Sequence, residues 1–227
     1  MSEHARDLRL WRLPRGRHGL PRELVERSQR ERLMAAIVRV SAVKGYEATS
    51  VADILEEAGV GRESFYELFA DKQDCMMAAR RLLIEDLADA ISTAYTGPDP
   101  WVDRVREALA ATLGWFAADP VAGRVVMLEL SALGPVSREI FQEDFDRFTS
   151  LLDEGLDGTG PRPEVPRATG LAVGAAFARI YDEVARDRTE ALPRMLPELT
   201  YEVLVPFLGE PAAREEERRA AAMQIAP

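Results

Sequence analysis

Hydrophobic residues recur at helical spacing through most of the chain, starting near residue 28. Leu33 and Ile37 stand at positions i and i+4, which places them on one face of a helix. Gly45 ends this predicted helix, because glycine readily adopts the backbone conformation that follows a helix C-terminus. Further towards the N-terminus no such period holds, and prolines and glycines interrupt the chain repeatedly. We therefore expect residues 1–27 to form a flexible basic arm.

Two short helices are predicted next, separated by a turn of three residues. The first begins at Thr49-Ser50, since both residues are good N-caps. The turn is Gly59-Val60-Gly61, where glycine permits a left-handed backbone. The second helix covers residues 62–69 and turns Phe65 and Phe69 to one side. Polar residues are left on or near its other side: Arg62, Glu63, Ser64, Tyr66 and Glu67.

Longer amphipathic helices are predicted over the remainder, divided by segments rich in glycine and proline. They cover residues 72–94, 101–118, 121–133, 137–156, 167–186 and 192–208. Runs typical of strands are scarce, so the expected fold class is all-α, with a three-helix N-terminal domain followed by a larger helical domain. The expected divisions are an arm over 1–27, domains over 28–75 and 76–208, and a tail with a solvated helix over 209–227.

Composition and charge narrow the picture further. A hydrophobic fraction of 47% over 227 residues is enough for a sizeable core. Cys75 is the single cysteine, and neither a signal peptide nor an apolar run long enough to span a membrane is found, so a cytoplasmic protein without disulfides is expected. Residues 1–45 hold eleven basic and five acidic residues, whereas residues 76–227 hold sixteen and twenty-six. A basic front on an acidic body is typical of a nucleic-acid-binding segment joined to another domain.

Two short helices joined by a glycine-containing turn have the geometry of a helix-turn-helix. In this motif the second helix enters the major groove, so its outward face must be short and polar, while the first helix braces it. Helix N-termini add unpaired N–H groups and positive dipole ends that attract phosphates. The helices that begin near Thr49 and Gly61 meet these requirements, so the sequence predicts a DNA-reading unit over residues 49–69.

The same region resembles the N-terminal signature of the TetR family of bacterial transcriptional regulators. The resemblance covers about Ser28 to Ala79 and agrees in spacing at many positions: Gly45-Tyr46, Thr49-Ser50-Val51, Ile54, Ala58-Gly59-Val60, Phe65-Tyr66, Phe69 and Lys72. It implies a three-helix helix-turn-helix domain, a larger helical ligand-binding domain, and dimerisation through the last two long helices. Gly61 departs from the pattern, because the family usually has serine or threonine at that helix start.

The resemblance also implies which residues contact DNA. Those expected to face base edges are Arg62, Glu63 and Ser64. Those expected to hold phosphates are Tyr66, Lys72, Thr49 or Ser50, and Gly61 at its helix start. The arm arginines are expected either to reach an adjacent groove or to remain a solvated tail: Arg15, Arg17 and Arg22.

Bulky residues of the larger domain are expected to build its core and to line a cavity for an apolar small molecule. The candidates for the wall are Trp115, Phe116, Met127, Leu130, Phe145, Phe148, Phe177 and Tyr181, with polar lining from Glu129, Arg179 and Tyr181. The segment 167–186 carries small residues that let another helix approach closely, among them Gly170, Gly174, Ala175 and Ala178. A homodimer through a four-helix bundle is therefore predicted, the alternative being that these faces pack within one subunit.

The function expected is that of a DNA-binding transcriptional regulator: a homodimeric repressor released from a palindromic double-stranded DNA operator by a small-molecule effector. Two alternatives are a TetR-type activator and a ligand-independent helical adaptor, and steep salt dependence distinguishes DNA binding from the latter. An enzyme is not expected, because both histidines, His4 and His18, lie in the arm and no phosphate-binding glycine loop occurs. No metal site, cofactor or membrane partner is expected either.

Overall fold

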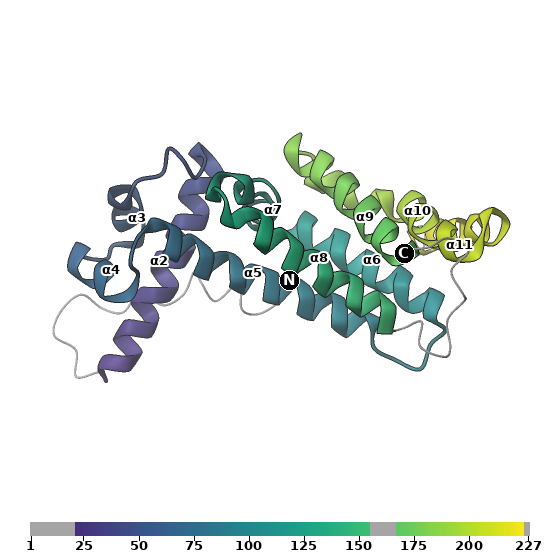
Figure 1. Ribbon diagram of the computed structural model, residues 1–227, viewed down its shortest axis with the longest axis horizontal. Coiled ribbons are helices and arrows are strands. Elements are labelled where there is room, and N and C mark those ends of the chain that lie inside the picture. The colour runs from purple at the N-terminus through teal and green to yellow at the C-terminus, as the bar shows by residue number, and fades with distance from the viewer. Residues whose placement is uncertain (1–20, 155–166, 225–227) are drawn as a thin grey trace.

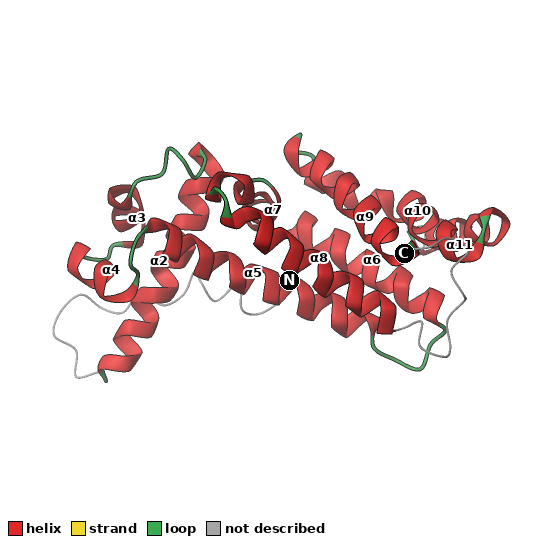
Figure 2. Ribbon diagram, viewed as in Figure 1, coloured by secondary structure: helices red, strands yellow, loops and turns green. Residues whose placement is uncertain are grey.

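The computed structural model describes residues 21–154 and 167–224, and every regular element within these ranges is a helix (Figures 1 and 2). Three helices form what we call the head: α2 (Arg22–Lys44), α3 (Val51–Ala58) and α4 (Arg62–Leu68). Helix α5 (Lys72–Tyr95) leads out of the head. The remaining helices, which we call the body, are α6 (Trp101–Ala118), α7 (Pro120–Met127), the 3-10 helix η1 (Glu129–Leu133), α8 (Val136–Glu154), α9 (Ala168–Ala185), the 3-10 helix η2 (Thr189–Met195), α10 (Leu196–Leu208) and α11 (Glu210–Met223). The predicted all-α fold is confirmed.

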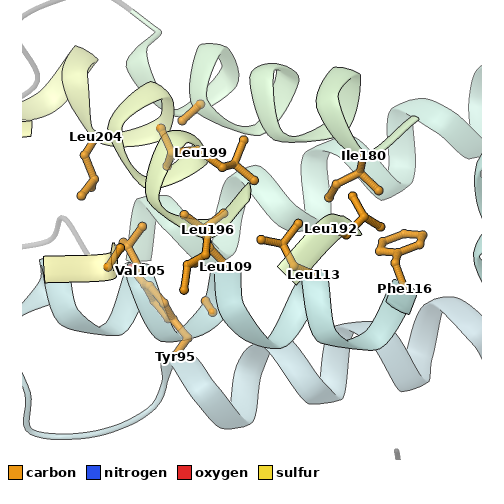
Figure 3. Close-up of a cluster of buried hydrophobic side chains, with 14 of the residues drawn as sticks. Tyr95, Val105, Leu109, Leu113, Phe116, Ile180, Leu192, Leu196, Leu199 and Leu204 are labelled. Carbon is orange, nitrogen blue, oxygen red and sulfur yellow. The ribbon is translucent and has the colours of Figure 1, made fainter. Parts of the chain in front are cut away.

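The molecule is elongated, with the head at one end, α9 to α11 towards the other, and α5 running between them (Figure 1). Each end has its own hydrophobic core. The head core joins side chains of α2, α3 and α4, such as Leu33, Ile54 and Phe65, to residues of α5, α7 and η1. The body core joins α5 and α6 to α9, η2, α10 and α11, as Figure 3 shows for Leu113, Leu192 and their neighbours. Burial of each such large side chain stabilises the fold by about 1.5–3 kcal/mol.

Helix α2 begins at Arg22, six residues earlier than the sequence pattern predicted. Pro21 is the N-cap residue, a position next to the first turn that proline tolerates because the first N–H groups of a helix have no partner within it. Ion pairs at i, i+4 spacing then support the first turns, Arg22 with Glu26 and Arg27 with Glu31. Proline therefore marks the start of this helix rather than an interruption.

The segment expected to form a solvated tail differs most from its expectation. Helix α11 packs against the body through Ala213 and Ala220, whose exposed fraction is 0%. The guanidinium of Arg106 on α6 donates to the carboxylate of Glu216 at 2.6 Å, and both side chains are buried. This buried pair links α11 to α6, and each partner has a second ion pair on its own helix, Arg106 with Asp103 and Glu216 with Arg219. None of the described helices is long and apolar enough to cross a membrane.

Candidate DNA-binding head and effector cavity

The turn between α3 and α4 is set by Gly59 and by an arginine of α2. Gly59 has φ +61° and ψ 41°, the left-handed conformation that glycine adopts without a steric penalty. The Arg32 guanidinium donates to the carbonyl oxygen of Ala58 from Nε at 3.0 Å and to that of Gly59 from Nη2 at 2.6 Å. These carbonyls lie at the end of α3, where a helix leaves its acceptors unpaired. Arg32 therefore fixes the angle at which α4 leaves the turn.

At the start of α3, the two predicted phosphate ligands, Thr49 and Ser50, differ in exposure. Ser50 is the N-cap, and its hydroxyl accepts from the backbone N–H of Asp53 at 3.3 Å, while Asp53 accepts from the N–H of Ser50 at 2.7 Å. Hydrogen bonds from Lys44 and Ser50 hold the pKa of the Asp53 carboxyl well below its usual range. Thr49 is buried, and its hydroxyl donates to the carbonyl of Gly45 at 2.8 Å. Ser50 thus faces outward and Thr49 faces into the head.

Helix α4 presents the outward polar face that the motif requires. Phe65 is buried in the head core, while Arg62, Glu63 and Tyr66 are exposed and Ser64 is half-buried. Tyr66 is 51% exposed, with its ring packed edge-on against Phe65. Consequently three of the residues expected to meet bases and phosphates on α4 are accessible, namely Arg62, Glu63 and Tyr66, whereas Ser64 is partly covered.

The side chain of Lys72 differs from its expected role at phosphates. Its Nζ donates to the carbonyls of Tyr46 at 2.9 Å, of Glu47 at 3.2 Å and of Thr49 at 2.7 Å. The ammonium also lies 4.4 Å from the centre of the Tyr46 ring. Because an ammonium has three donors, these bonds occupy all of them. Lys72 therefore secures the loop that precedes α3.

The charge of the head is uneven. Residues 46–75 hold two basic residues and eight acidic ones, two of which are paired with α2: Asp53 with Lys44, and Glu57 with Arg39. Most basic residues of the head therefore lie on α2. Arg22 is exposed at the start of α2 and pairs with Glu26, while Arg15 and Arg17 lie outside the described residues.

A cavity of about 160 Å³ lies in the body between α5, α6, α8 and α9. Its wall includes six of the eight predicted residues: Phe116, Met127, Leu130, Phe145, Phe148 and Phe177. Trp115 lies outside, where its indole N–H donates to Asp86 at 2.7 Å. Tyr181 also lies outside, 43% exposed and stacked on Phe177.

The polar residues of the cavity are not the expected ones. Glu129 faces the head, and Arg179 pairs with Glu198 of α10 at 2.7 Å. The wall instead holds Arg80 of α5 and Asp144 of α8, joined by an ion pair of 2.7 Å. Arg80 was detectable in the sequence, since it lies at helical spacing with Ile84, Leu87 and Ile91 on the apolar face of α5.

Comparisons with known proteins agree with this architecture. Residues 33–79 match the model of the family described as bacterial regulatory proteins, tetR family. The fatty acid degradation regulator FadR from Bacillus halodurans is similar in structure, with 20% identity, 79% of this chain and 94% of that chain covered, and a TM-score of 0.67. FadR from Bacillus subtilis, in complex with stearoyl-CoA, has 18% identity and a TM-score of 0.65, with 78% of this chain and 97% of that chain covered. A TetR family transcription regulator from Marinobacter aquaeolei VT8 has 22% identity and a TM-score of 0.61, with 78% of this chain and 97% of that chain covered. No curated protein matches the chain.

The family match lies in the head, whereas the likeness of fold extends over the head and the body. Residues 33–79 match the TetR-family model, and the described chain has the same fold as solved TetR-family transcription regulators. The family match of the head implies a role in DNA-binding regulation.

Proposed function

We propose that the protein is a homodimeric repressor that leaves a palindromic operator when a largely apolar small molecule occupies the cavity of the body. The observation that carries this proposal is the outward face of α4, joined through α5 to an apolar cavity. Arg62, Glu63 and Ser64 of that face would read base edges in the major groove. Tyr66, Ser50 and the backbone at Gly61 would hold phosphates, and the arginines of the arm and of α2 would supply positive charge.

The outer face of α9 supports the homodimer. Leu171 is 57% exposed and Tyr181 43% exposed, and between them the face carries only small side chains. A side-chain carbon added at Gly174 would meet nothing within 4 Å in this chain, so the surface beside that residue is open. A symmetric partner helix would fill this surface and complete a four-helix bundle with α10. Such symmetry matches the two half-sites of a palindrome.

Helix α5 supports coupling between the cavity and the head. Its first turns place Cys75, Met76 and Ala79 in the head core, whereas Ile84 and Leu87 line the cavity further along the same helix. A ligand that favours one position of α5 would change the spacing of the two heads in the dimer. Operator affinity would then fall by the ratio of the ligand's affinities for the two states. The stearoyl-CoA complex of the similar FadR from Bacillus subtilis supports an effector with a large apolar part.

Selection of bound sequences from random duplex DNA tests the proposal. We expect an enriched palindrome with half-sites about 10 base pairs, or ~34 Å, apart. Affinity for it should fall steeply as salt rises, because phosphate contacts release counterions. If no sequence is enriched and binding is indifferent to salt, the chain is a protein-binding adaptor instead.

A further inference from the structure

The wall of the cavity in the body extends along two helices, α5 and α8. On α5 its wall follows one helical face from Arg80 to Tyr95, a span of about 22 Å at the usual rise per residue. On α8 the wall runs from Phe141 to Leu152, about 16 Å by the same measure. Helices α5 and α6 lie alongside each other over this length (Figure 1). A wall that extends this far along two helices suits an unbranched chain better than a compact ring system.

The charged groups of the wall meet at one end. Thr112 and Tyr95 also line the cavity, but the Thr112 hydroxyl donates to the carbonyl of Ala108 and the Tyr95 hydroxyl to that of Leu152. Arg80 and Asp144 are the charged residues of the wall, and they are paired with each other. The cavity is therefore apolar along its length and ionic at the end nearest the head.

The two members of this pair differ in exposure. The Arg80 side chain is 7% exposed, and its Nη2 also donates to the carbonyl of Val126 at 3.3 Å. Its Nε is buried and has no hydrogen-bond partner. The Asp144 side chain is 20% exposed, and both members of the pair border a second, polar cleft that is also lined by Arg81, Glu143 and Arg147. Asp144 is therefore the more exposed member of the pair, and Arg80 is the more buried one.

We propose that the effector is a long unbranched acyl chain, and that Arg80 binds its terminal carboxylate or carbonyl oxygen in place of Asp144. This inference rests on the proposed role of the cavity as the effector site. The chain would lie along α5, and the acyl oxygen would accept from Nε and from the donor that Asp144 releases. A charge-assisted hydrogen bond to a buried guanidinium is strong enough to fix the direction of the chain. An amine at the same place would face the positive charge of Arg80.

Direct binding of two ligands with one chain length tests the inference. Monomeric palmitate and hexadecylamine are titrated into the full-length protein and followed by calorimetry, with the fluorescence of Trp115, whose ring lies 5.0 Å from the cavity residue Phe116, as a second signal. We expect palmitate to bind and hexadecylamine to bind at least roughly tenfold more weakly. Equal binding of the two, or no binding of palmitate and palmitoyl-CoA, would overturn the inference. Palmitoyl-CoA distinguishes the sources: tighter binding of the thioester identifies an acyl thioester, and tighter binding of palmitate identifies a free acid.

Variants of the ion pair make the test specific. Asp144→Asn removes the competing carboxylate, so palmitate should bind roughly tenfold more tightly. Arg80→Gln should abolish the preference for palmitate over hexadecylamine, and circular dichroism shows whether this variant folds. Arg147→Gln changes a charge in the neighbouring cleft and should leave palmitate affinity unchanged. Unchanged or weaker binding by Asp144→Asn would refute the exchange even if Arg80→Gln unfolds. If the protein selects a palindrome but binds neither acyl ligand, this inference fails and the proposed regulator stands.

Discussion

The carboxylate of Glu129 accepts a hydrogen bond from the backbone N–H of Tyr46 at 2.8 Å, which joins η1 to the head. Both residues are buried, and Tyr46 lies on the loop that leads into α3. Next to Glu129, Leu130 lines the cavity and also belongs to the head core. A ligand that moves this segment would therefore move the loop before α3, by a second route besides α5.

Replacement of Glu129 by alanine should destabilise the junction of head and body. The N–H of Tyr46 would stay buried without an acceptor, which costs about 1–3 kcal/mol of unfolding free energy. Glu129→Gln keeps one acceptor oxygen and should lose less. Urea unfolding followed by circular dichroism measures the difference. Glu139→Ala, at an exposed position of α8, serves as control and should change stability by less than about 0.5 kcal/mol. Equal losses in Glu129→Ala and Glu139→Ala would show that the bond has no energetic role.

Two glycines of the same turn should respond to substitution in opposite directions. Gly61 has φ −73° and ψ 154° as the N-cap of α4, and an added side-chain carbon there meets nothing within 4 Å. Gly61→Ser should therefore stabilise the head by about 0.5–1 kcal/mol, through a cap hydrogen bond and a less flexible unfolded chain. Gly59→Ala should destabilise it by about 1–2 kcal/mol, since φ is +61° and the new carbon would lie 3.2 Å from the Arg32 guanidinium. Thermal unfolding of the pair tests both signs, and stabilisation by Gly59→Ala would contradict the left-handed turn.

Substitutions of Tyr66 and Lys72 should affect different properties: that of Tyr66 should weaken DNA binding, and that of Lys72 should lower the stability of the head. Tyr66→Phe keeps the ring on Phe65 and removes only the hydroxyl, so unfolding should be unchanged while operator binding weakens roughly tenfold or more. Lys72→Ala removes three hydrogen bonds to loop carbonyls and should lower the unfolding free energy by about 1–3 kcal/mol. Mobility shifts on the selected palindrome and urea unfolding give the two readouts. An unstable Tyr66→Phe, or a fully stable Lys72→Ala, would reverse these assignments.

Local structure could be predicted from the sequence, because it depends on residues that are close together along the chain. The 3.6-residue period predicts the long helices, and Gly59 predicts the turn, since both follow from backbone conformation. Pairings across the fold were not readable: Arg80 lies on the apolar face of its helix, but nothing near it in the sequence indicates that its partner is Asp144, 64 positions away. Helix α11 was underestimated because its buried positions are mostly alanines, which give a weak amphipathic signal. The carbonyls that Lys72 binds lie in a loop whose path no local pattern specifies.

A charge on the outer face of α9 should split the proposed dimer. Leu171→Asp would bury an unpaired carboxylate in the interface, at a cost of about 3–5 kcal/mol, which weakens association roughly a hundredfold or more. Sedimentation should then show a monomer with unchanged helix content and weakened binding to the palindrome. Leu82→Asp is the matched control, because Leu82 is 46% exposed on α5 rather than on α9. A Leu171→Asp protein that remains dimeric would place the interface elsewhere.

The buried thiol of Cys75 should make the head sensitive to high pH. Burial in the head core raises its pKa from 9.0 to about 12, because the thiolate loses its hydration there. Between these values the unfolded chain releases the thiol proton and the folded chain keeps it. Deprotonation therefore favours unfolding, and stability should fall as pH rises above about 9, by at most about 1.4 kcal/mol per pH unit for one proton. Burial raises the pKa of Tyr46 as well, so part of the decline should persist in Cys75→Ala. Urea unfolding from pH 8 to pH 10.5 compares the two proteins.

At pH 8 the native thiol should resist iodoacetamide and react once urea unfolds the chain, whereas rapid alkylation of the native protein would show that the thiol is accessible.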